Sequence, residues 1–149
     1  MVKAFNHMAR APQFTRTVED SVVLMLFDIA NELGKLGDGV SSRAGLTTQQ
    51  WLMLLQIAGD PNFAVPAGAL TRKGPGVMAS EIARSRGVSR ANVSTLVSQL
   101  LRKGMVRQAE SPHDRRRKHL TVTDAGRAAL ADIESARHDA NQQLFASLP

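Results

Sequence analysis

A helical repeat of apolar residues between Ser89 and Leu101 is the clearest pattern in the chain. The spacing i, i+3, i+4, i+7, i+8 of one helix face is followed by Val93, Leu96, Val97, Leu100 and Leu101. The opposite face carries short polar or cationic side chains, namely Arg90, Asn92, Ser94, Thr95 and Ser98. Because Ser89 is a favourable N-cap and Gly104 a favourable stop, the sequence predicts a helix with one buried and one polar face.

A second, shorter helix is predicted just upstream, over Met78 to Arg86, with Ile82 and Ala83 facing inward. Gly87 breaks it two residues before the cap of the next helix. A helix, a tight turn with glycine and a second helix with a polar outer face are typical of a helix-turn-helix.

Two short extended runs follow, Met105 to Ala109 and Lys118 to Thr123, joined through a turn at Ser111 to Asp114. The basic run Arg115-Arg116-Arg117-Lys118 is expected at the tip of this hairpin. A two-stranded hairpin with a basic tip, directly after a recognition helix, is interpreted as a wing.

Long amphipathic helices are predicted at both ends of this module. The first begins at Thr15 or Thr17 and runs to about Leu36, where Gly34, Gly37 and Gly39 end it before a loop to Leu46; its inward residues are Val22, Leu26, Ile29 and Leu33. The last runs from Thr123 to about Leu148, with Leu130, Ile133, Ala140 and Leu144 at helical spacing. Because the compact module offers these stripes little surface, they are predicted to pair with the same helices of a second chain.

Between the first helix and the helix-turn-helix, Thr47 and Gln50 form a capping box that opens another helix. That helix is expected to bury Trp51, Leu54, Leu55 and Ala58. The next stretch, residues 59–76, contains three prolines and several glycines, which favours a long loop or a small hairpin over any helix. Residues 1–13 are interpreted as an irregular arm.

Composition narrows the function classes. The 149 residues, 43% of them hydrophobic, suffice for one domain with a real core. The longest apolar run, Val22 to Phe27, is too short to span a membrane, and the N-terminus lacks a signal pattern, so a cytoplasmic protein is expected. The absence of cysteine excludes disulfides, thiol-based redox sensing and thiolate metal sites.

The positive charge is concentrated in one region. The net charge is +6, yet residues 72–119 hold 12 Lys/Arg against 3 Asp/Glu, and the rest of the chain is net acidic. Basicity serving only solubility would be spread along the chain, whereas a surface that binds a polyanion concentrates it. The charge pattern therefore predicts a DNA-binding face on the helix-turn-helix and wing.

No pattern indicates a catalytic or metal site. The four histidines lack a shared helix face or ligand spacing: His7, His113, His119 and His138. There is no nucleophile–base pair and no pair of carboxylates in a motif context. The sequence therefore predicts a protein that is not an enzyme and uses no cofactor and no metal.

Three stretches of the chain, and the order of the predicted elements, resemble the MarR family of bacterial winged-helix transcription regulators. Asp114 to Gly126 resembles the family's wing-and-exit pattern of Asp-Arg-Arg, a hydrophobic strand and Leu-Thr-x-x-Gly, with Val122 in place of the Leu. Leu46 to Trp51 resembles the opening of its second helix, and Ser89 to Val106 its recognition helix and the entry to its wing. The resemblance extends from about Thr15 to Leu148. Two departures stand out: the 59–76 insert is much longer than the family's usual connection, and the cysteines of the family's peroxide-sensing branch are absent.

The resemblance implies a mainly α (α+β) fold in a single domain covering residues 1–149. A winged helix-turn-helix lobe at 47–122, with a two-stranded β-wing and an insert at 59–76, would be flanked by dimerisation helices at 15–38 and 123–148. It further implies a homodimer on a palindromic double-stranded DNA site. A small effector, often an aromatic acid, is expected to lower the DNA affinity, and no membrane partner is expected.

Candidate DNA-binding residues on the recognition helix are Ser89, Arg90, Asn92, Ser94 and Thr95, since Arg suits guanine, Asn suits adenine and hydroxyls reach bases or phosphates. In the wing, one of Arg115, Arg116 and Arg117 is expected in the minor groove. Asp114 is a candidate for orienting a wing arginine, or it is only a turn former. Arg43 and Trp51 are candidates for a ligand pocket; alternatively Trp51 belongs to the core and Arg43 is a solvated loop residue.

The sequence thus predicts a sequence-specific DNA-binding transcriptional regulator, a repressor that a small ligand releases from DNA. Two alternatives stay open at this point. One is a ligand-independent architectural DNA-binding protein, and the other is a winged helix that binds protein partners. The basic lobe argues against the second, because a protein-binding module needs no polyanion-binding face.

Overall fold

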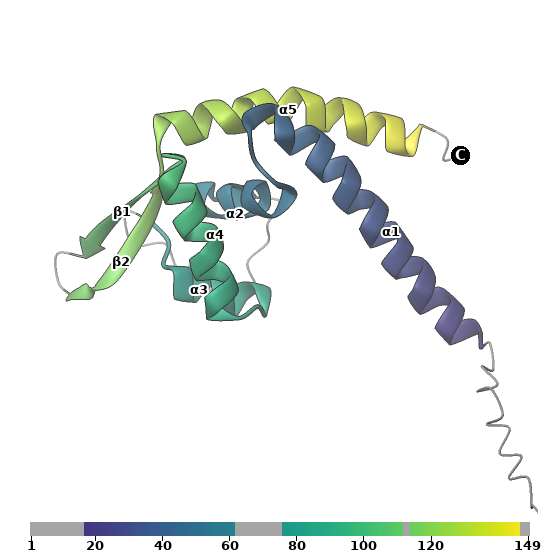
Figure 1. Cartoon of the computed structure of the whole chain (residues 1–149), viewed down its shortest axis with the longest axis horizontal. Coiled ribbons are helices and arrows are strands. Elements are labelled where there is room, and N and C mark those ends of the chain that lie inside the picture. The colour runs from purple at the N-terminus through teal and green to yellow at the C-terminus, as the bar shows by residue number, and fades with distance from the viewer. Residues whose placement is uncertain (1–16, 62–75, 112–113, 147–149) are drawn as a thin grey trace, which may run out of the picture. The chain divides into compact units, whose positions relative to one another are not determined.

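A computed structural model of the chain describes residues 17–61, 76–111 and 114–146, without the side chains of residues 111 and 114–116 (Figure 1). Two compact units are formed, residues 1–33 and 34–149. The elements are α1 (Val18–Ser41), η1 (Ser42–Ala44), α2 (Thr48–Ala58), α3 (Ala79–Arg86), α4 (Arg90–Arg102), β1 (Val106–Ser111), β2 (Asp114–Val122) and α5 (Asp124–Phe145). The predicted fold class, mainly helical with a helix-turn-helix and a two-stranded wing, is confirmed.

The core of the second unit is built around α2. Residues Gln50 to Ile57 of this helix are all buried except the half-buried Leu52, and Met53 and Leu54 are almost inaccessible to solvent. Helices α3, α4 and α5 and strand β2 each contribute a fully buried residue to the same cluster: Ile82, Leu100, Ile133 and Leu120. The prediction that α2 buries a single stripe was therefore too narrow, because the helix is covered on nearly all sides. It was also wrong for Ala58, which is exposed at the end of the helix.

The helix-turn-helix is formed as predicted. Helix α3 ends at Arg86 and is capped by Gly87, which adopts a left-handed conformation with φ of 63°. The Val88 amide donates to the Ala83 carbonyl at 3.1 Å, which closes the last turn of α3. Ser89 then caps α4, so two residues, Gly87 and Val88, separate the end of α3 from the cap of α4.

The wing is the antiparallel pair β1–β2, in which Val106 pairs with Val122 and Glu110 with Lys118. Beyond this point the register shifts, because Ser111 pairs with Asp114. Arg115 to Arg117 therefore lie at the start of β2, beyond the last regular pair, so the basic run is at the distal end of the hairpin, in the strand and not in the turn. A bulge of this kind gives the strand extra residues without opposing partners. Pro112 and His113, within the predicted turn, lie outside the described residues.

A third segment joins this sheet through a single bridge. The Val77 amide donates to the Leu120 carbonyl at 3.1 Å, and the Leu120 amide donates to the Val77 carbonyl at 2.8 Å. Gly76 lies so close to β2 that a Cβ at this position would be 2.5 Å from the Leu120 carbonyl oxygen. The end of the 59–76 insert is thus fixed beside the wing, whereas residues 62–75 lie outside the described part of the chain.

Helix α1 continues to Ser41, so the prediction that it ends near Leu36 was wrong. The predicted loop at residues 37–46 was also wrong as far as Ala44, because η1 follows α1 directly. The reason is a contact with α2. Gly37 is buried against Thr48, where a Cβ would be 2.7 Å from the Thr48 side chain. The Asp38 carboxylate accepts hydrogen bonds from the Thr48 hydroxyl at 2.6 Å and the Thr48 amide at 2.9 Å, which hold the pKa of Asp38 below its usual value.

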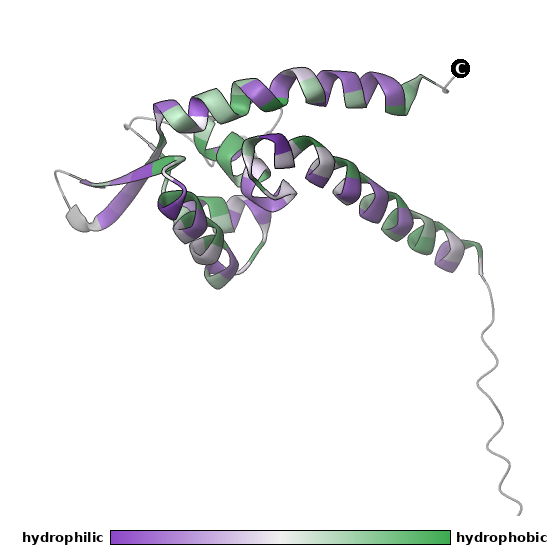
Figure 2. Cartoon of the chain, turned by 45° about the horizontal axis from the view of Figure 1, so that its top comes forward, coloured by the Kyte–Doolittle hydropathy of each residue, from purple (hydrophilic) through white to green (hydrophobic). Residues whose placement is uncertain are grey.

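The apolar residues of α1 are exposed within this chain. Its large hydrophobic side chains from Val18 to Leu36 are 44–77% exposed, and Figure 2 shows the hydrophobic colour along much of the helix. The predicted inward residues Val22, Leu26, Ile29 and Leu33 belong to this set. None of the helices in the described ranges is both long and apolar enough to cross a membrane.

Helix α5 buries only its first half. Ala129, Ile133 and Ala136 are buried, whereas Leu144 and Phe145 at its end are exposed. The helix ends at Phe145, slightly before the predicted end near Leu148. Arg137, which pairs with Glu134 on the same helix, also lies 3.9 Å from the Asp60 carboxylate just after α2, so α5 and α2 are joined by charge as well as by packing.

Candidate nucleic-acid interface

Helix α4 has a sharply divided surface. Val93, Val97 and Leu100 are at most 5% exposed, and Leu96 and Leu101 are half-buried against the same core. The five candidate contact residues all lie on the exposed side: Ser89, Arg90, Asn92, Ser94 and Thr95. Because the apolar face packs against the core, the polar face of α4 is presented outward as one surface.

Two hydroxyl groups of this surface also make local hydrogen bonds. The Ser89 hydroxyl oxygen accepts from the Asn92 amide at 3.2 Å and caps the helix. The Thr95 hydroxyl donates to the Ala91 carbonyl at 3.0 Å. Thr95 therefore offers an outside partner an acceptor oxygen and a methyl group, whereas the proton of Ser89 is still available for donation.

The first turn of α4 is suited to a phosphate group. Arg90 is the first residue of this 13-residue helix. The backbone amides of the first turn lie at the positive end of the helix dipole. The neighbouring α3 adds Arg84, which is exposed, and Arg86, which is half-buried. Positive charge thus gathers around the Gly87 turn, next to the residues that could contact bases.

The wing adds a second basic surface. Arg117 and Lys118 are exposed on β2, and Figure 2 shows the strand pair largely in the hydrophilic colour. The backbone of Arg115, Arg116 and Asp114 lies in the same strand, but their side chains are outside the described part. The role of Asp114 in orienting an arginine therefore stays a prediction.

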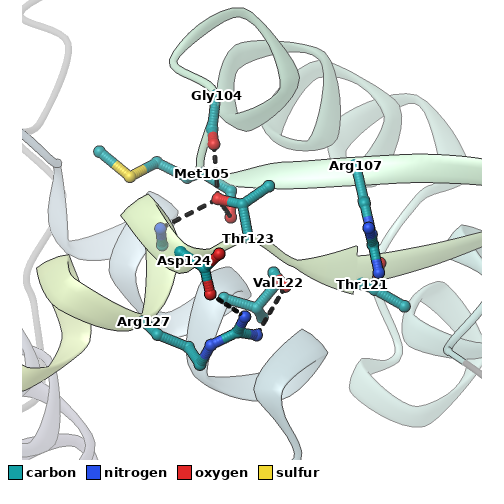
Figure 3. Close-up of polar contacts among 9 residues, drawn as sticks. Gly104, Met105, Arg107, Thr121, Val122, Thr123, Asp124 and Arg127 are labelled. Atoms are coloured by element: carbon teal, nitrogen blue, oxygen red, sulfur yellow. Dashed lines mark hydrogen bonds and ion pairs between the residues drawn. The ribbon is translucent and has the colours of Figure 1, made fainter.

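A compact hydrogen-bonded junction connects α4, the wing and α5 (Figure 3). The Thr123 hydroxyl donates toward the Gly104 carbonyl at 2.6 Å and lies 3.1 Å from the Met105 carbonyl, and it accepts from the Gly126 amide at 3.0 Å. The Thr123 amide donates to the Met105 carbonyl at 3.1 Å. Arg127 donates to the Val122 carbonyl at 3.0 Å and pairs with Asp124. The end of the recognition helix and both roots of the wing are thus held at one point.

The two candidate pocket residues differ in their exposure to solvent. Trp51 is 8% exposed and belongs to the hydrophobic core, as its alternative interpretation predicts. Arg43 is exposed on η1. The pocket stays a prediction that these positions alone do not support.

The sequence profile of the MarR family matches residues 44–117, which run from the end of η1 through the helix-turn-helix into the wing. The chain belongs to the MarR family. The resemblance of its wing and recognition-helix motifs is thereby confirmed.

Individual proteins similar to this MarR-family chain regulate transcription in opposite senses. The transcriptional activatory protein BadR of Rhodopseudomonas palustris is 35% identical over 104 residues, covering 68% of the chain and 52% of BadR. The transcriptional repressor MprA of Escherichia coli K12 is 31% identical over 72 residues, covering 48% of the chain and 41% of MprA. The chain spans about half the length of these curated relatives or less.

The MarR-type fold extends over most of the chain. CouR from Rhodococcus jostii RHA1, solved bound to p-coumaroyl-CoA, superposes with a TM-score of 0.67 at 20% identity. The match covers 91% of this chain and 85% of CouR. At this identity the similarity shows the fold alone.

Arg107 is a candidate contact of this MarR-family wing that the sequence analysis missed. It is exposed on β1, and its Nε donates to the Thr121 hydroxyl on β2 at 3.0 Å (Figure 3). The bond orients the guanidinium from one strand across to the other. The signal was present in the sequence, because both residues fall in predicted strands, but their pairing depends on a register that only the structure supplies.

Proposed function

We propose that this MarR-family chain is a sequence-specific transcriptional regulator that binds double-stranded DNA. Helix α4 enters the major groove, and the wing lies along the neighbouring minor groove. The observation that supports this most strongly is the division of α4, whose apolar face is buried while its cap residue Ser89 and four polar residues of its first half are exposed. An α-helix fits into the major groove, and polar side chains on its outer face can hydrogen-bond to the base edges there.

The polar residues have distinct roles in this proposal. Arg90 donates to guanine and Asn92 pairs with adenine, because these side chains match the edges of those bases bidentately. Thr95, whose proton is used within the helix, accepts from an amino group or contacts a thymine methyl group. One of Arg115, Arg116 and Arg117 enters the minor groove, where a narrow A·T-rich segment attracts guanidinium.

The salt dependence of DNA binding tests the electrostatic part of this function. Each phosphate that the protein neutralises contributes about −0.9 to the slope of log affinity against log salt, so several such phosphates per subunit predict a slope beyond roughly −4. Arg107→Ala should make the slope less steep by about 1 for each phosphate that is no longer neutralised. Fluorescence anisotropy between about 50 and 200 mM salt measures both values. A nearly flat profile for the unmodified protein would rule out a basic DNA-binding face.

The regulator is proposed to act as a homodimer through α1. At 100° per residue, most of the apolar side chains between Val22 and Leu33 cover an arc of roughly 200°, about twice the stripe that a core-facing helix needs. All the large ones are at least 46% exposed in the single chain. Such a surface needs a partner that covers it from more than one side, and a second copy of α1 and α5 supplies it.

Sedimentation velocity at micromolar concentration tests the dimer. The unmodified chain should sediment as a dimer, and Ile29→Glu should shift it toward monomer because the new carboxylate would be buried without a partner. The control is Asn31→Glu, since Asn31 lies two positions away on the polar side of α1. A well-folded monomer of the unmodified chain would contradict the dimer.

We further propose that the regulator is a cytoplasmic repressor that a small aromatic ligand releases from DNA. MprA supports the sense of regulation, whereas BadR shows that an activator can share as much sequence. CouR, with its bound p-coumaroyl-CoA, supports the ligand class. A thermal-shift screen of aromatic acids and their coenzyme A thioesters tests it, because a ligand of the folded state raises the melting temperature. A true effector should also release the protein from DNA.

A further inference from the structure

Gln50 occupies a position where one side chain meets three parts of the second unit. It lies in the first turn of α2 and is 6% exposed. Its Oε1 accepts from the Thr47 amide at 3.2 Å, which completes the capping box of α2. The same oxygen accepts from Lys103 Nζ at 3.0 Å, and Gln50 Nε2 donates to Gln99 Oε1 at 2.9 Å.

The two outer partners of Gln50 belong to the recognition helix. Gln99 lies in the last turns of α4, and Lys103 is its C-terminal cap residue. Lys103 Nζ also donates to the carbonyl of Gly45, the left-handed residue that ends η1. The Gln50 network, defined as Gln50, Gln99, Lys103 and the Gly45 carbonyl, therefore links the end of α4 to the start of α2 and to the turn before it.

A capping box alone does not account for these contacts. The cap needs only one acceptor oxygen, whereas Gln50 also donates to Gln99 and shares its oxygen with Lys103. The apolar face of α4 resists separation from the core but resists small rotations less, because dispersion and hydrophobic contacts are not directional. Directional hydrogen bonds at the end of the helix supply that restraint.

We propose that Gln50 is a positioning residue for DNA readout, which fixes the rotation and tilt of α4 through Gln99 and Lys103. This inference rests on the proposed function, because it assumes that α4 reads bases. In this proposal Lys103 serves to hold α4 in place through intramolecular hydrogen bonds and does not contact DNA. Its position between residues 72 and 119 had placed it among the basic residues of the predicted DNA-binding face. Base readout depends on the orientation of α4, because bidentate pairs with base edges tolerate little misplacement.

The matched pair Lys103→Met and Arg102→Met separates positioning from charge. Both variants lose one positive charge at adjacent exposed positions, but only Lys103 is hydrogen-bonded to Gln50 and Gly45. Gln50→Leu removes the network from the other side. Gln50→Glu keeps the oxygen that Thr47 and Lys103 need, and the Gln99 amide can turn to donate to it, so this variant should behave like the unmodified protein.

Two measurements are compared for each folded variant. The first is the ratio of affinity for the preferred DNA site to affinity for random duplex at fixed salt. The second is the rate of hydrogen exchange in the last turn of α4 in the free protein. Gln50→Leu and Lys103→Met should each lower the ratio about ten-fold or more, comparable to one mismatched base pair, and should speed exchange. Arg102→Met should leave both unchanged.

The inference is overturned if folded Lys103→Met retains both values, or if the ratio and the exchange rate do not change together. It is also overturned if Arg102→Met lowers the ratio as much as Lys103→Met, because the effect would then be charge alone. Should Gln50→Leu fail to fold, Lys103→Met decides. If the unmodified protein prefers no DNA sequence, the proposed function fails instead, and the exchange rates still show whether the network holds α4.

Discussion

Gly126→Ala is expected to destabilise the folded chain by about 3 kcal/mol. A Cβ at this position would be 2.1 Å from the Met105 carbonyl oxygen and 2.7 Å from Cγ1 of Val122. The carbonyl cannot move away freely, because it accepts from the Thr123 amide and also lies 3.1 Å from the Thr123 hydroxyl. The methyl group must therefore break the junction that holds α4, the wing and α5 together.

Urea unfolding followed by circular dichroism measures this loss, and Gly39→Ala is the matched control. Gly39 is an exposed glycine within α1, and a Cβ there would have no atom within 4 Å. Alanine should therefore stabilise that helix by up to about 1 kcal/mol. Equal unfolding midpoints for Gly126→Ala and the unmodified chain would show that the junction is not packed as described.

Arg90→Ala is expected to weaken binding to the preferred DNA site by about 1–3 kcal/mol and to relax the preference at one base pair of each half-site. Arg90 is exposed at the start of α4, so its removal leaves the core intact. Asn92→Ala should act in the same way at a different base pair. Arg116→Ala, in the wing, should instead weaken binding mainly to sites with A·T-rich flanks.

Affinities for a panel of single-base variants of the preferred site separate these effects. A helix variant should lose affinity for its own base pair and bind all bases there alike, whereas the wing variant should respond to the flanks. Equal losses for all three variants on every sequence would mean that α4 contributes charge and does not read bases.

The recognition helix and wing could be predicted from the sequence because their signals are local. The cap at Ser89, the apolar spacing from Val93 to Leu101 and the turn at Gly87 all lie within the segments that they define. The exposure of the five polar residues follows from the same spacing. Local propensity and tertiary packing agree here, so the pattern was sufficient.

Features that depend on distant contacts could not be predicted. Three glycines near the end of α1 each lower helix stability by about 1 kcal/mol, and this indicated a helix end. The helix continues because Thr48 packs against Gly37 and donates to Asp38, a contact that no local pattern contains. The Gln50 network is similar, since the capping box was visible but its partners lie 49 and 53 residues away.

The position of the wing arginines shows the same limit at shorter range. Residue types identified Arg115 to Arg117 as basic and near a turn, yet their place in β2 depends on the register break opposite Glu110 and Ser111. A register is set by pairing across strands, and composition does not contain it.

Selection from a library of random DNA duplexes tests the central claim most directly, since that claim is that α4 reads DNA sequence. The unmodified protein should enrich a palindromic motif whose half-sites lie about one helical turn apart or a multiple of it. Arg90→Ala should enrich a motif in which one base pair of each half is no longer specified. Recovery of no motif, or of the same motif by both proteins, would contradict the claim.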